Sequence, residues 1–104
     1  MRDVSRVLRQ VQKVQEEVAR VQEQLAQERL EATAGGGFVR VVVDGHGRVL
    51  EVHIAPEVVD PADVETLEDL VLAAVHQAQE QARARAEERL RGIAGGLGLP
   101  GAFF

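Results

Sequence analysis

The chain has 104 residues and no cysteine, which excludes disulfide bridges, thiolate catalysis and cysteine-ligated zinc. Its length allows a single domain, and a composition of 45% hydrophobic and 28% charged residues is typical of a folded soluble protein. The net charge of −5, taken over the whole chain, argues against a nucleic-acid partner.

Valine and leucine recur over the first quarter of the chain with alternating spacings of three and four residues, at positions 4, 7, 11, 14, 18, 21 and 25. This spacing is the a/d pattern of a heptad repeat, and the Gln, Glu, Arg and Lys residues between these positions are good helix formers. The pattern predicts one helix over about residues 3–29. Because a lone helix cannot cover its own apolar stripe, we expect the stripe to pack against another helix.

The next segment carries the period-two alternation of strands, interrupted by two turns. We predict strands over about residues 30–34, 38–44 and 48–54. The glycines at 35–37 end the first strand. The sequence Asp44-Gly45-His46-Gly47 predicts a hairpin, because glycine adopts the positive φ angles that tight turns need.

The two faces of the predicted sheet differ in character. One face carries only aliphatic side chains and fits beneath the helices. The other mixes apolar residues with charged and polar ones, so we expect this second face, or the sheet edge, to contact another subunit. The predicted dimer-interface residues are Phe38, Val42 and Val49.

A second long helix is predicted over about residues 61–91. Asp60 followed by Pro61 resembles a helix start, and leucine, valine and then alanine recur at helical spacing up to Gly92. The alanine-rich end permits close approach of the first helix. We therefore predict an α+β domain in which a small antiparallel sheet packs against two long helices.

The predicted domain covers residues 1–92. The remaining segment, residues 93–104, is rich in glycine, and we expect it to be a flexible tail.

No pattern in the sequence points to catalysis, a metal or a cofactor. His46, His53 and His76 lack metal-ligand spacing, and no serine or threonine has a base beside it in the sequence. The glycines at 35–37 lie between a helix and a strand, unlike a phosphate loop. The chain also lacks the apolar run of a signal peptide or membrane span. We expect a cytoplasmic protein that is not an enzyme and has no small-molecule substrate, cofactor or membrane partner.

Charge is segregated along the chain. Residues 1–13 and 83–91 each contain four basic residues, whereas residues 44–69 contain eight acidic residues and one basic residue. A solvated helix face is the simplest interpretation of the first cluster. If the two long helices pack antiparallel, however, residues 2–13 lie beside residues 83–91, and both clusters form one basic pole suited to the phosphates of duplex DNA. The predicted DNA-binding residues are Arg2, Arg6, Arg9, Lys13, Arg83, Arg85, Arg89 and Arg91.

The order of these features resembles the YbaB/EbfC family from end to end. The resemblance rests on VLRQVQKVQEEVARVQEQL, AGGGFVRVVVDGHGRVLEVHIAPEVVDP, LEDLVLAAVHQA and the final GGLGLPG. It implies an α-β-β-β-α protomer, a tight homodimer with projecting helical arms, and association with DNA in the bacterial nucleoid. It implies neither a cofactor nor a catalytic residue.

Two hypotheses for function follow. The first is a nucleoid-associated homodimer that binds double-stranded DNA and alters its conformation or organisation. The alternative is a protein–protein interaction module, in which the heptad helix or the tail binds a component of the replication or repair machinery.

Overall fold

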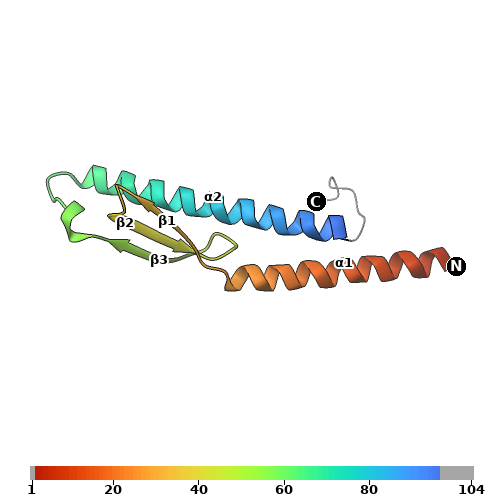
Figure 1. The fold of residues 1–104 in the computed structure, drawn as a ribbon. Coiled ribbons are helices and arrows are strands. Elements are labelled where there is room, and N and C mark those ends of the chain that lie inside the picture. Colours follow the sequence, from red (N-terminus) through yellow and green to blue (C-terminus); the bar gives the residue numbers. More distant parts are fainter. Residues whose placement is uncertain (1, 97–104) are drawn as a thin grey trace.

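The computed structural model describes residues 2–96, with side chains from Asp3 onward. Two long helices and three strands follow one another in the order α-β-β-β-α (Figure 1), which confirms the predicted α+β fold class. The elements are α1 (Arg2–Gln27), β1 (Leu30–Ala34), β2 (Val39–Val43), β3 (Val49–Ile54), a 3-10 turn η1 (Pro56–Val58) and α2 (Val64–Gly96).

The strands form an antiparallel meander in the order β1-β2-β3, so β1 and β3 are the edge strands. Leu30 of β1 pairs with Val43, and Val39 at the other end of β2 pairs with Ile54 of β3. The turn between β1 and β2 contains Gly35–Gly37, whose φ angles are 64°, 72° and 97°. Residues with a Cβ atom rarely adopt such angles, which explains why this turn needs glycine.

The turn between β2 and β3 is held by the side chain of Asp44. Its Oδ1 atom accepts hydrogen bonds from the backbone N–H groups of His46 at 2.9 Å and Arg48 at 3.0 Å. The following residue, Gly45, donates its own N–H to the carbonyl oxygen of Leu25 at 2.8 Å. The hairpin turn therefore also fixes the C-terminal end of α1.

The main core lies between α2 and the sheet. Its buried residues are Ala32, Val39, Val41, Val43, Ala74, Ala78 and Ala82. Alanines on the helix side allow close approach to the strands, and α2 lies over β1 and β2. In contrast, α1 extends beyond the end of the sheet and packs against α2 (Figure 1). The aliphatic face is thus covered by α2 alone, which corrects the expectation that both helices cover it.

The second helix begins and ends later than predicted. Asp63 caps its start, because Asp63 Oδ1 accepts a 3.3 Å hydrogen bond from the backbone N–H of Thr66. Asp63 Oδ2 also accepts a 2.6 Å hydrogen bond from the Thr66 hydroxyl, which lowers the pKa of Asp63. The helix passes through Gly92 and continues to Gly96, since Ile93 and Ala94 are buried. The predicted tail boundary at residue 93 is therefore wrong, and residues 97–104 lie outside the described part of the chain.

Substitution of Gly45 tests the contact between the hairpin turn and α1. A Cβ atom on Gly45 would lie 2.5 Å from the carbonyl oxygen of Leu25 and 2.8 Å from its Cα. We expect Gly45→Ala to reduce the free energy of unfolding by about 1–3 kcal/mol, measured by urea denaturation.

Gly92→Ala is the matched control, because a Cβ atom there meets nothing within 4 Å. Within a helix this change should increase stability by about 0.5–1 kcal/mol. Equal effects of the two substitutions would contradict the close approach at Gly45.

Candidate nucleic-acid interface

The two long helices run antiparallel and meet near the C-terminal end of α1 (Figure 1). We call this contact the α1 anchor; its residues are Val18, Val21 and Leu25 of α1 with Ala86, Leu90 and Ile93 of α2. Leu25 is 1% exposed, whereas Val7 on the same stripe is 58% exposed. The predicted packing of the heptad stripe against a second helix is therefore confirmed for its second half only.

The N-terminal half of α1 extends past the end of α2 (Figure 1). We call residues 2–13 the α1 arm. Arg6, Arg9 and Lys13 of the arm are exposed, and no carboxylate lies within ion-pair distance of them among the side chains from residue 3 to residue 96. Asp3 is the one acidic residue in this segment. The arm thus presents uncompensated positive charge to solvent.

The arginines near the end of α2 are in a different environment, because each lies beside a glutamate of the same chain. Arg83 pairs with Glu80 and, at 2.5 Å, with Glu87. The hydrogen bond to Glu80 raises the pKa of Arg83, and the same bond lowers the pKa of Glu80. Arg91 also approaches Glu87, at 3.4 Å. These ion pairs offset much of the positive charge that this end of α2 carries.

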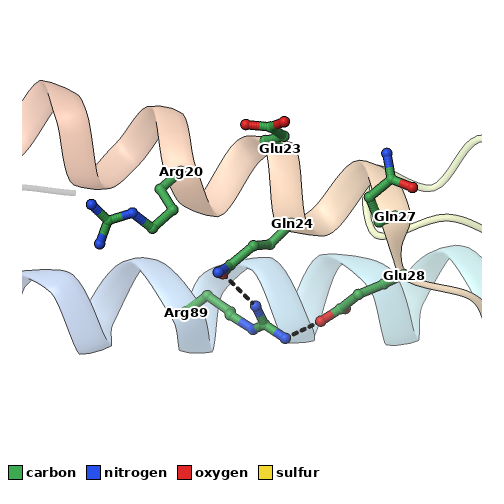
Figure 2. Close-up of a pocket in the computed structure, with 6 residues that line it drawn as sticks. All are labelled: Arg20, Glu23, Gln24, Gln27, Glu28 and Arg89. Carbon is green, nitrogen blue, oxygen red and sulfur yellow. Dashed lines mark hydrogen bonds and ion pairs between the residues drawn. The ribbon is translucent and has the colours of Figure 1, made fainter.

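Arg85 and Arg89 are paired across the helix contact. Arg85 lies 3.8 Å from Glu28, and Arg89 binds Glu28 and donates a 3.1 Å hydrogen bond to Gln24. Figure 2 shows Arg89 reaching from α2 to these two residues on the first helix and the chain that follows it. Residues 83–91 therefore lie beside residues 20–28 and not beside residues 2–13. The predicted single basic pole is wrong, because the α1 anchor shifts the arm past the end of α2.

A groove between the helices is lined by Arg20, Glu23, Gln24, Gln27, Glu28 and Arg89 (Figure 2). Its two arginines are balanced by two glutamates, so the groove does not favour an anion. Glu28 is its most constrained member: Oε1 binds Arg89, while Oε2 is buried and has no hydrogen-bond partner. Sequence analysis missed Glu28, because nothing in the local pattern shows that two arginines about 60 residues away converge on it.

Two of the three histidines, His46 and His53, contact polar atoms of the same chain. His46 Nε2 lies 2.9 Å from the carbonyl oxygen of Gln22, and His53 Nε2 lies 2.8 Å from Glu51. Over residues 2–96, no group of three or more His, Asp or Glu side chains is placed to hold a metal ion. Nor does any helix in this range have the length and apolar character needed to cross a membrane.

Comparison with known proteins identifies the family. A sequence profile described as the YbaB/EbfC DNA-binding family matches residues 1–97. The chain belongs to this family. A nucleoid-associated protein from Geobacillus kaustophilus is 53% identical to this YbaB/EbfC protein over 103 residues, which cover 99% of this chain and 95% of the relative. One from Thermoanaerobacter pseudethanolicus is 51% identical over 77 residues, covering 74% and 69%.

A solved structure shows the same fold. The crystal structure of an uncharacterised protein from Helicobacter pylori superposes with a TM-score of 0.73 at 17% sequence identity, covering 81% of this chain and 88% of that one. The profile match confirms the resemblance to YbaB/EbfC proteins drawn from the sequence, and the structure confirms the α-β-β-β-α order of elements.

The residues predicted to form a dimer interface fall in unlike environments. Phe38 and Val49 are exposed, whereas Val42 is 3% exposed within the protomer. Val42 lies in the sheet between Glu31 and Glu51. These glutamates form ion pairs with Arg40 and Arg29, respectively, whose long side chains add to the polar cover on this face. The structure therefore corrects the placement of Val42, which is not available on the protomer surface.

Three further apolar side chains are exposed on the opposite face of β3. Leu50, Val52 and Ile54 lie on the aliphatic face of the sheet but are 39–44% exposed, because α2 covers β1 and β2 and leaves β3 uncovered. β3 is also an edge strand. The sheet therefore exposes apolar side chains along an edge strand.

Leu25→Ala tests whether the α1 anchor holds the two helices together. The substitution removes a side chain that is 1% exposed, so we expect the free energy of unfolding to fall by about 2–5 kcal/mol in urea denaturation. Leu72→Ala is the control, because Leu72 on α2 is 53% exposed and should cost much less. Similar losses from both substitutions would argue against the anchor.

Proposed function

We propose that this YbaB/EbfC protein binds duplex DNA as a homodimer in the bacterial nucleoid and alters DNA conformation without catalysing a reaction on it. The proposal rests on family membership and on one structural observation, the uncompensated cations of the α1 arm. The relatives that match over nearly the whole chain are named nucleoid-associated proteins, which supports the proposed location.

The chemistry of the α1 arm suits phosphate contacts. Arg6, Arg9 and Lys13 lie on the side of α1 away from the apolar stripe, so they can approach a DNA backbone without disturbing the packing of the helix. The chain has no tryptophan or tyrosine, so stacking platforms for single-stranded bases are absent from its sequence. Binding of this kind depends on charge and neutralises phosphates with little sequence information.

The arginines of α2 have a smaller part in the proposed binding. Arg83, Arg85, Arg89 and Arg91 each have a glutamate as an intramolecular partner. A phosphate would have to compete with that carboxylate. Of the eight basic residues predicted from the sequence, we therefore assign the principal contacts to those of the α1 arm, with Arg2 included by its position in the sequence.

A homodimer would bring two arms to one DNA molecule. The aliphatic face of β3 stays uncovered in the protomer, and burying Leu50, Val52 and Ile54 against a second copy would remove their apolar surface from water. Phe38 and Val49, which are also exposed, lie close to the same edge. Two linked arms bind more tightly than one, because the second contact becomes intramolecular.

The salt dependence of DNA binding tests the α1 arm. Replacement of Arg6, Arg9 and Lys13 by Gln removes six phosphate-binding charges from a dimer that uses both arms. The slope of log Kobs against log salt concentration should then become shallower by about 5. Fluorescence anisotropy with a labelled DNA duplex across a salt series measures this slope.

The matched control removes the same number of charges from α2, by Arg83→Gln, Arg85→Gln and Arg91→Gln, and leaves Arg89 to hold the helices together. Because these arginines already pair with glutamates, the slope should change less than in the α1 variant. A larger loss of binding in the α2 variant would contradict the assignment to the arm.

The proposed dimer contact is tested by Val52→Asp, which places a charge in the middle of the aliphatic face of β3. We expect sedimentation velocity to show a change from dimer to monomer, with weaker DNA binding because each particle then has a single arm. Leu72→Asp introduces the same charge at an exposed site on α2 and should leave the dimer intact. A stable Val52→Asp dimer, with helix content confirmed by circular dichroism, would exclude this surface.

A further inference from the structure

The α1 arm carries an apolar stripe that nothing covers among residues 2–96. Val4, Val7, Leu8 and Val11 are 57%, 58%, 58% and 47% exposed. Their spacings of three, four and seven residues place them on one side of the helix. This stripe continues the surface that packs against α2 at the α1 anchor, but it begins where α2 has ended.

The geometry of the two helices determines which part of the chain lies nearest to this stripe. Ile93 packs in the α1 anchor, and α2 ends one turn later, at Gly96. Because the helices are antiparallel, α2 ends alongside α1, and α1 runs on beyond that end (Figure 1). The segment that follows Gly96 is therefore attached on the arm side of the α1 anchor, toward the inner end of the stripe.

The composition of that segment matches the stripe. Residues 97–104 include Leu97, Leu99, Phe103 and Phe104 and contain no ionisable side chain. Eight residues can span up to about 26 Å when extended, whereas the stripe from Val11 to Val4 is only about 10 Å long. The segment is thus long enough to follow the whole stripe.

We propose that residues 97–104 dock on the apolar stripe of the α1 arm in the same chain. Docking would bury four large apolar side chains of the arm and leave Arg6, Arg9 and Lys13 facing solvent, so the covered arm remains able to bind phosphate. A second copy of the arm is the alternative occupant, but it must come from another chain. Residues 97–104 are instead attached to Gly96 beside the α1 anchor, so their contact with the stripe is intramolecular.

A single tryptophan reports on the docking, since the natural chain contains neither tryptophan nor tyrosine. The probe is the full chain with Phe104→Trp. We expect blue-shifted emission and weak quenching by acrylamide, because the indole ring is shielded on the stripe. Adding Val7→Gln and Val11→Gln should shift the emission to that of a solvent-exposed indole and increase the quenching.

The control pair is Val64→Gln and Leu72→Gln, which replaces two equally exposed apolar residues of α2 and should leave the emission unchanged. Circular dichroism checks that α1 keeps its helix content in the arm variant, since glutamine is a good helix former. Solvent-exposed emission in the Phe104→Trp chain would overturn the proposal. So would shielding that survives Val7→Gln and Val11→Gln, or shielding that disappears on dilution of the dimer, which would indicate a second copy.

Discussion

Leu25 of α1 connects this helix to α2 and to the hairpin turn between β2 and β3. Its side chain is buried between α1 and α2, and its carbonyl oxygen accepts a 2.8 Å hydrogen bond from Gly45 in the hairpin turn. The absence of a side chain at Gly45 allows this approach, since a Cβ atom would overlap the backbone of Leu25. The contact fixes the register of α1 against α2, and that register leaves the basic N-terminal half of α1 without a neighbouring helix.

The same register separates two groups of arginine that look alike in the sequence. Those near the end of α2 lie among Glu28, Glu80 and Glu87, and their charges are largely balanced within the protomer. Those of the α1 arm are held away from these carboxylates. A chain with a net charge of −5 can therefore still present a strongly positive surface, because net charge does not describe where opposite charges meet.

The structural features that depend on residues close together in the chain could be predicted from the sequence. The heptad spacing gives α1, the period of two gives the strands, and the glycines at 35–37 and 47 follow from the positive φ angles of the two turns. Gly45 is explained instead by its distant contact with Leu25. What could not be predicted depends on contacts between distant residues. The length of α2 beyond Gly92 depends on burial of Ile93 against Val21, and the convergence of Arg85 and Arg89 on Glu28 depends on the helix register. Val42 lies in a strand as expected, but the ion pairs around it give that face of the sheet a polar character.

The length of the α1 helix also amplifies any change in its tilt. The helix is packed against α2 at Leu25, and Arg6 lies about 28 Å from Leu25 along the helix axis. A tilt of α1 by about ten degrees about Leu25 would move Arg6 by about 5 Å, which exceeds the rise of about 3.4 Å between successive phosphates of one DNA strand. In the proposed complex with DNA, small differences in side-chain volume around Leu25 would therefore change which phosphates the N-terminal end of α1 contacts, and with them the geometry of the bound duplex.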